Sequence, residues 1–239
     1  MKGYLKRKKQ LKDKTMKIDS NRTPRYCPDL FSNPEILSGI RLVIFDFDGT
    51  LGDSQKLITD TMLATIEKLN LPKRSREECA RTIGLPLKKC FTSIIPMTDE
   101  QAEECVKVYS DIFNVKNVPG AVKPFPGVIE CLSSQGVAMS IASSRSHHSL
   151  ALLVEDLGLS KYITYLIGAD DVVNKKPAVE AVLATLAHFN VKAHETLVVG
   201  DTEFDILMGR NAGTHTCGVT YGNGSRESLE AVEAEWIVC

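Results

Sequence analysis

The chain of 239 residues lacks features that define several protein classes. It has no run of 18 or more apolar residues, so we expect no transmembrane helix. None of the seven cysteines forms a C-x-x-C pair, and their scattered spacing disfavours a zinc site or a disulfide framework. Residues 1–23 contain no apolar segment of the kind found in secretory signals. These absences together predict a protein of the reducing cytoplasm.

The chain as a whole also lacks an excess of either charge, because its net charge is −1. Residues 1–26, however, hold ten Lys or Arg and two Asp, so the remainder carries −9. Nucleic-acid binding needs a basic face, and we therefore expect no nucleic-acid partner for the globular part. Like charges resist packing, so residues 1–38 are predicted to form a basic, flexible extension; contact with RNA or an anionic membrane is the alternative.

Short apolar runs alternate with helical patterns along most of the chain. Runs rich in Val, Ile and Leu predict strands over 41–48, 137–142, 165–168, 196–200 and 216–219. Apolar residues at helical spacing predict helices over 127–134, 147–157, 178–189 and 204–211. This alternation predicts an α/β fold, a Rossmann-like three-layer arrangement around a parallel sheet.

The segment 55–121 interrupts the alternation, since it shows helical patterns and no strand pattern. Helices are predicted over 57–69, 77–83 and 87–95, and Thr98 is a candidate cap for a further helix that reaches Phe113. We therefore expect an all-helical cap domain over 55–121, inserted into a core domain made of residues 39–54 and 122–239.

Acidic residues follow two of the predicted strands. Asp46 and Asp48 end the first, and two carboxylates two residues apart on an extended strand would point to the same side. Such a pair repels unless a cation offsets it, and carboxylate oxygens suit Mg²⁺. Asp201 and Asp205 follow the strand at 196–200. The structural alternatives are an Asp-Gly turn after the first strand and helix capping by Asp201.

Hydroxyl and amino groups follow two further strands. Ser143 and Ser144 come after 137–142, where a hydroxyl and free N–H groups can hold a phosphate, although helix capping is the alternative. Lys176 precedes Pro177, which suits a first helical turn; a solvated Lys pair is the alternative. Ligands of open α/β sheets bind beyond the carboxyl ends of the strands, so we expect these groups to form one site.

The sequence around these residues resembles the haloacid dehalogenase-like phosphohydrolases, in the group with a helical cap after the first motif. Phosphoglycolate phosphatases and β-phosphoglucomutases belong to that group. The resemblance covers residues 40–239 and is carried by FDFDGTLGDS (45–54), FPGV (125–128) and VVGDTEFDILMGRNAG (198–213). It departs from the family pattern at Gly52, where a larger residue is frequent, and at Ser143-Ser144-Arg145, where many members have Thr-Asn-Lys.

The resemblance implies a role for each candidate residue. Asp46 matches the nucleophile and Asp48 the general acid/base. The implied phosphate-binding residues are Ser143, Ser144 and Lys176. The implied Mg²⁺-binding residues are Asp46, Asp48 through its backbone carbonyl, Asp201 and Asp205. Arg81 lies in a segment that resembles the cap loop facing the active site, and is a candidate substrate-binding residue.

The implied activity is Mg²⁺-dependent hydrolysis of a small-molecule phosphate monoester through an aspartyl-phosphate, with phosphoglycolate-like substrates ahead of sugar phosphates. One alternative is a phosphosugar mutase, although such relatives often carry Glu-Asp where this chain has Gly200-Asp201. Another is a catalytically silent phosphate-binding protein, although no motif residue is missing. We expect a monomer or a homodimer.

Overall fold

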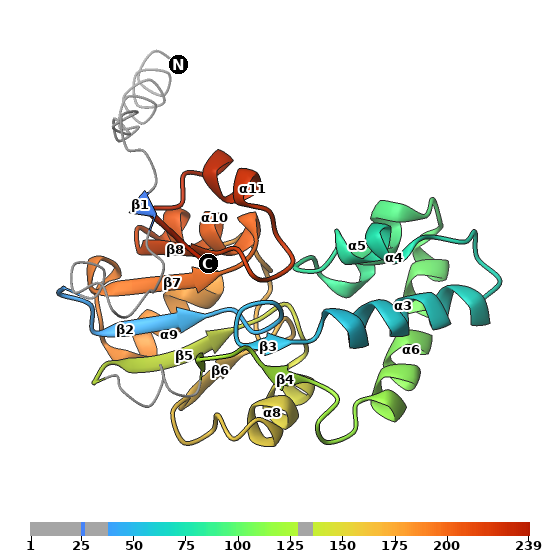
Figure 1. Cartoon of the computed structure of the whole chain (residues 1–239), viewed down its shortest axis with the longest axis horizontal. Coiled ribbons are helices and arrows are strands. Elements are labelled where there is room, and N and C mark those ends of the chain that lie inside the picture. Colours follow the sequence, from blue (N-terminus) through green and yellow to red (C-terminus); the bar gives the residue numbers. More distant parts are fainter. Residues whose placement is uncertain (1–24, 27–37, 129–135) are drawn as a thin grey trace, which may run out of the picture.

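The computed structural model describes residues 25–26, 38–128 and 136–239. Seven strands form one sheet, in which all neighbouring strands run parallel (Figure 1). In spatial order they are β1 (Arg25–Tyr26), β9 (Trp236–Val238), β8 (His215–Val219), β7 (Thr196–Gly200), β2 (Leu42–Phe45), β5 (Ala138–Ala142) and β6 (Tyr165–Ile167). All five predicted strands are confirmed, whereas β1 and β9 were not predicted.

Helices cover both faces of the sheet. They are α8 (His147–Asp156) on one face and α9 (Glu180–Phe189), α10 (Glu203–Ala212) and α11 (Arg226–Ala231) on the other. A short 3₁₀ helix, η1 (Ala193–Glu195), leads into β7. The predicted three-layer α/β arrangement is therefore confirmed.

Alternate residues of β2 show how the sequence builds these layers. Val43 and Phe45 belong to the apolar cluster that includes the α8 side chains, whereas Leu42 and Ile44 belong to the cluster with α9 and α10. All four are buried, as expected for a parallel strand that is covered on both sides. The buried strand fixes where its carboxyl end, and hence Asp46, emerges.

Four helices between β3 and β4 form a separate group beside the sheet, which we call the helical insertion (residues 55–116) (Figure 1). They are α3 (Gln55–Lys68), α4 (Arg76–Ala80), α5 (Leu87–Ile94) and α6 (Asp99–Lys116). Thr98 caps α6 as predicted. Because β3 (Gly52–Asp53) and β4 (Lys123–Pro124) pair with each other, the chain leaves the sheet and returns to it through adjacent strands.

Aromatic side chains of the helical insertion pack against one another and belong to the core of the sheet. The rings of Tyr109 and Phe113, both on α6, lie 5.8 Å apart and nearly parallel, and Phe91 of α5 meets Tyr109 edge-on. All three side chains belong to the same apolar cluster as Val43 and Phe45 of β2. The insertion and the sheet therefore share one continuous core.

Some predictions fall elsewhere or outside the described residues. Pro177 does not lie in a first helical turn, since residues 176–177 form a turn and α9 begins only at Glu180. The helix expected over 127–134 lies mostly outside the described residues. The expected extension, 1–38, contributes β1 to the sheet edge, and most of its other residues lie outside the described part.

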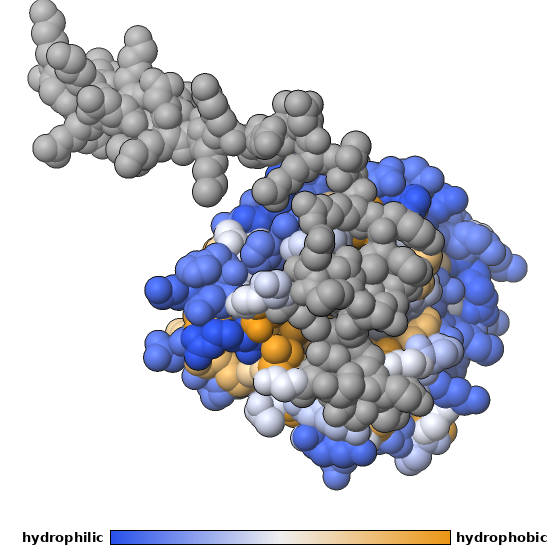
Figure 2. Space-filling view, turned by 60° about the vertical axis from the view of Figure 1, so that its left-hand side comes forward, coloured by the Kyte–Doolittle hydropathy of each residue, from blue (hydrophilic) through white to orange (hydrophobic). Residues whose placement is uncertain are grey.

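The described part of the face shown in Figure 2 is mainly hydrophilic. No helix within 38–128 or 136–239 has the length and apolar character needed to cross a membrane. In the view of Figure 2 the periphery is hydrophilic, and hydrophobic residues gather in smaller areas nearer the middle. The exposed large apolar side chains are scattered along the sequence: Val115, Val118, Leu152, Val173, Leu183 and Tyr221.

Candidate active site

Strand β2 delivers Asp46 to the carboxyl edge of the sheet. The N–H of Asp46 donates to Val199 O at 2.8 Å, so the backbone stays bound to β7 one residue beyond the strand. Asp46 Oδ1 accepts a hydrogen bond from Lys176 Nζ at 2.6 Å, and the same ammonium donates to Asp205 Oδ1 at 2.5 Å. The side chain of Lys176 is only 5% exposed. Lys176 therefore forms a buried bridge between two carboxylates.

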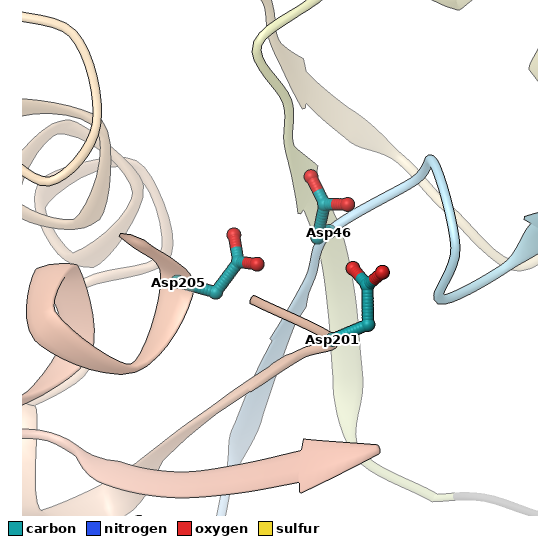
Figure 3. Close-up of side chains that lie close together, drawn as sticks. All are labelled: Asp46, Asp201 and Asp205. Atoms are coloured by element: carbon teal, nitrogen blue, oxygen red, sulfur yellow. The ribbon is translucent and has the colours of Figure 1, made fainter. Parts of the chain in front are cut away.

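Asp201 completes a cluster of three carboxylates. Asp46 follows β2, Asp201 follows β7 and Asp205 lies in the first turn of α10; Figure 3 shows their carboxylates pointing to the same side, beyond the strand ends. One oxygen of each lies within 4.8 Å of the others. When all three carboxylates are ionised, the ammonium of Lys176 leaves two negative charges, which equals the charge that a divalent cation would neutralise.

Burial and mutual repulsion change the acidity of this cluster. Burial raises the pKa of Asp46 well above its usual value; Lys176 opposes that shift, and the neighbouring carboxylates reinforce it. Burial and then Asp205 raise the pKa of Asp201 to about 7, against hydrogen bonds from Asn223. Burial alone would lower the pKa of Lys176, but Asp205 and Asp46 raise it above its usual value. Lys176 alone therefore does not balance the negative charge of the three carboxylates. Oxygen ligands of this kind fit Mg²⁺.

Gly200 and Thr202 hold Asp205 in place. A Cβ atom at Gly200 would lie 2.2 Å from Asp205 Cβ, so glycine at the end of β7 leaves the space that Asp205 occupies. Asp205 Oδ2 accepts from the N–H of Thr202 at 3.1 Å and from its hydroxyl at 2.7 Å, within the capping box that begins α10. The other oxygen of Asp205 remains bound to Lys176.

Asn223 is a site residue that the sequence reasoning missed. Its N–H and its side-chain Nδ2 donate to Asp201 Oδ2 at 2.6 and 3.1 Å, and Nδ2 also donates to the carbonyl of Asp48 at 3.1 Å. The Asp48 carbonyl therefore lies beside the carboxylate cluster. Asn223 lies between two glycines after β8, and that Gly-Asn-Gly sequence at a fifth strand end was the available signal.

The side chain of Asp48 belongs to a second ion-pair network. Its Oδ1 accepts from Arg145 Nε at 2.9 Å, from Arg145 Nη2 at 2.7 Å and from the Ser54 hydroxyl. Asp46 and Asp48 therefore do not share one partner, because the chain turns after Asp46 and Phe47 O accepts three turn hydrogen bonds. Arg145 departs from the family pattern, and the sequence predicted no role for it.

Ser143 and Ser144 follow β5 and have different surroundings. Ser143 is buried, its N–H donates to Ile167 O, and its Oγ accepts from the N–H of Arg145 at 3.3 Å. Ser144 Oγ donates instead to the carbonyl of Gly84, in the helical insertion, at 2.7 Å. Both line a small pocket whose polar lining is completed by Lys175 and Lys176. Ser143 and Lys176 thus line one space, and their binding of phosphate stays a prediction.

The loop between α4 and α5 approaches the site through Gly84. A Cβ there would lie 3.0 Å from Thr202 Cγ2, and its φ of +102° favours glycine. Arg81, the candidate substrate residue, is exposed at the end of α4. The loop therefore reaches the sheet edge at Gly84, whose carbonyl binds Ser144, while Arg81 lies three residues earlier.

Comparison with known proteins agrees with this geometry. The family model of haloacid dehalogenase-like hydrolases matches residues 43–219. A protein named probable phosphatase IndB from Dickeya dadantii is 37% identical over 82% of this chain and 88% of its own length. Pyrophosphatase PpaX from Anoxybacillus flavithermus is 31% identical over 83% of this chain and 92% of its own length.

Two further comparisons extend the same result. A phosphoglycolate phosphatase from Aquifex aeolicus is 30% identical over 77% of this chain and 86% of its own length. The crystal structure of a predicted phosphatase from Clostridium acetobutylicum superposes with a TM-score of 0.76 at 27% identity, over 83% of this chain and 93% of that one. The chain therefore belongs to the haloacid dehalogenase-like hydrolase family and is one of its phosphatases.

Proposed function

We propose that the chain hydrolyses small-molecule phosphate monoesters with Mg²⁺, through an aspartyl-phosphate on Asp46. The observation that carries the proposal is the position of the Asp46 carboxylate, bound to Lys176 and clustered with Asp201 and Asp205 at the carboxyl ends of the strands. A nucleophilic carboxylate next to a phosphate dianion needs positive charge around it. Lys176 supplies one such charge.

Asp46, Asp201 and the carbonyl of Asp48 would hold Mg²⁺, with Asp205 supporting them directly or through water. Bound there, the ion would offset the negative charge of the cluster and of the phosphate oxygens. The excess of two negative charges and the raised pKa values of Asp46 and Asp201 support this assignment. Oxygen ligands are also those that Mg²⁺ prefers.

The reaction would proceed in two displacements at phosphorus. A carboxylate oxygen of Asp46 attacks phosphorus as the bond to the leaving oxygen breaks, and Asp48 gives that oxygen a proton. Asp48 then takes a proton from water as the water attacks the aspartyl-phosphate, which releases phosphate and restores Asp46. Ser143 and Lys176 would bind the equatorial oxygens throughout. Three donors converge on Asp48 Oδ1, whereas none from the described residues binds Oδ2, which supports Oδ2 as the oxygen that exchanges the proton.

The helical insertion is proposed to act as a cap over this site. Its support is the contact between Ser144 and Gly84 and that between Arg145 and Phe113, both of which join the sheet edge to the insertion. Two relatives are named pyrophosphatase and phosphoglycolate phosphatase, and these names support a small substrate with more than one negative group for this chain. A cytoplasmic location is proposed on the buried, unpaired cysteines Cys79, Cys90 and Cys105.

The test is phosphate release from an aryl phosphate, measured with Mg²⁺ and with a chelator. We expect Mg²⁺-dependent turnover that falls by at least about a thousandfold in Asp46→Asn, because the amide is a poor nucleophile. Asp99→Asn is the matched control, since its carboxylate is 82% exposed and lies on α6. Turnover that survives the chelator, or an Asp46→Asn variant within tenfold of the native rate, would reject the proposal.

A further inference from the structure

Arg145 is a buried cation for which the transfer chemistry gives no role. Its side chain is 9% exposed, and its guanidinium binds Asp48 Oδ1 through Nε and Nη2 and the Ser149 hydroxyl through Nη1. Burying an ion pair costs desolvation energy that mutual attraction seldom exceeds, so such a pair is weak evidence for a stabilising role. The burial of Arg145 is therefore better explained by a function than by a gain in stability.

The position of Arg145 connects the phosphate-binding segment with the helical insertion. Its backbone N–H donates to Ser143 Oγ at 3.3 Å. Its guanidinium carbon lies 4.9 Å from the ring centroid of Phe113, on α6, and 5.8 Å from that of Phe47. On the proposed function, on which this inference rests, Asp48 meets the leaving oxygen, so the guanidinium lies beside the part of the substrate attached to that oxygen.

The guanidinium has donors to spare for a ligand. Arginine carries five N–H groups in a planar fork. Its hydrogen bonds to Asp48 and Ser149 use one N–H group each on Nε, Nη1 and Nη2. Two of the five N–H groups therefore have no partner among the described residues. A planar fork with free donors matches the paired oxygens of a carboxylate or a phosphate. The neighbouring rings of Phe47 and Phe113 restrict water and would strengthen such a contact.

We propose that Arg145 is a specificity-determining residue that binds a second anionic group, a carboxylate or a second phosphate, on the leaving part of the phosphate ester. A substrate of this class places one anion against Lys176 and Ser143 and the other against the guanidinium. The exposed Arg81 is not needed for this contact. Neutral leaving groups would be bound less tightly, because they leave those donors without a partner.

The test uses phosphonates that cannot be hydrolysed, so that binding is read independently of turnover. Titration calorimetry in Mg²⁺ buffer compares 3-phosphonopropionate, its neutral amide and methylenebisphosphonate. We expect the native chain to bind 3-phosphonopropionate, methylenebisphosphonate or both at least about tenfold more tightly than the amide. A charge-assisted contact with the second anionic group predicts this difference. The carboxylate and phosphonate arms then show which second anion is preferred.

Variants of Arg145 decide the assignment. In Arg145→Gln the preference over the amide should disappear, and in Arg145→Lys, which keeps the charge and loses the fork, part of it should remain. Because Arg145→Gln leaves Asp48 without its partner, the double variant Arg145→Gln/Asp48→Asn provides a second measurement with the pair removed as a unit. Equal native affinity for all three ligands, or a preference that survives in the glutamine variants, would overturn the inference. Absence of turnover with intact binding preference would instead reject the proposed hydrolysis and leave the anion site standing.

Discussion

Two ion-pair networks lie side by side at the carboxyl ends of the strands, and they differ in charge. In the first, Lys176 lies between Asp46 and Asp205, with Asp201 close by, and two negative charges remain. In the second, Arg145 and Asp48 carry one charge of each sign and are neutral together. The first network needs a cation to be balanced, whereas the second is balanced until a ligand competes for the guanidinium.

This difference separates the two tasks of the proposed enzyme. The unbalanced network surrounds the atom that would be phosphorylated, where extra positive charge is needed to admit a phosphate dianion. The balanced network lies toward the helical insertion, beside Phe113, where the remainder of the substrate would be recognised. Changes in the first should therefore alter metal binding and chemistry, and changes in the second should alter ligand preference.

The largest effect on stability is expected from Lys176→Met. Removing the ammonium leaves Asp46 and Asp205 buried without a counter-charge, which should lower the free energy of unfolding by about 3–5 kcal/mol in chelator. Phosphate release should fall by roughly a hundredfold or more, since a charge that faces the phosphate is lost. Urea unfolding and the aryl phosphate assay measure the two effects. Lys107→Met, on the exposed side of α6, is the control.

A smaller effect is expected from the metal itself. At a Mg²⁺ concentration a hundred times its dissociation constant, the free energy of unfolding of the native chain should rise by about 2.7 kcal/mol. Asp201→Asn should weaken Mg²⁺ binding by more than about a hundredfold, because a direct ligand matters more than its outer partners. Thermal unfolding against Mg²⁺ concentration measures both. A melting temperature of the native chain that does not change with Mg²⁺ concentration would contradict the proposed need of the first network for a cation.

Asn223→Ala should weaken Mg²⁺ binding less, by about tenfold to a hundredfold. Its side chain supports Asp201 and the Asp48 carbonyl, while the backbone N–H that binds Asp201 stays in place. The same Mg²⁺ titration measures this change, with Asn117→Ala, at the end of α6, as control. Loss as severe as in Asp201→Asn would mean that Asn223 does more than support the ligands.

The smallest effect concerns pH in the absence of metal. The pKa of Asp201 rises from 3.8 to about 7 on folding, so between these values the folded chain binds more protons than the unfolded chain. The contribution of Asp201 to the free energy of unfolding should therefore fall as pH rises through that window. Urea unfolding in chelator at several pH values, native against Asp201→Asn, isolates this slope. A native slope no steeper than that of the variant would contradict the raised pKa.

The sequence predicts most of the sheet because buried parallel strands are continuous apolar runs. Strands β2, β5, β6, β7 and β8 all carry that pattern. The two-residue β1 is too short to show a period, whereas β9 is an apolar run as long as β6 and was not predicted. Strand β9 pairs with β8 and β1 pairs with β9, and both pairings are tertiary contacts without a local signal.

The approach of Asp46 to Asp201 follows from the strand ends, since parallel strands bring their carboxyl ends together, whereas Lys176 reaches them from a turn and Asp205 from α10. Side-chain direction does not follow in the same way. Asp48 was expected to point with Asp46, and the turn after Phe47 sends it to Arg145 instead. The direction of the Ser144 side chain could not be predicted either, because its partner Gly84 is set by how the helical insertion packs.

The antiparallel pair of β3 and β4 joins the helical insertion to the rest of the chain. Because both ends of the helical insertion meet in one small ribbon, its entry and exit points are fixed whatever lies between them. Strands β2 and β5 pair directly across that interruption, in an unbroken register from Leu42 opposite Ala138 to Phe45 opposite Ile141. The strands that lead to Asp46 and Ser143 therefore keep their register through direct pairing, independently of the helices that lie between them in the sequence.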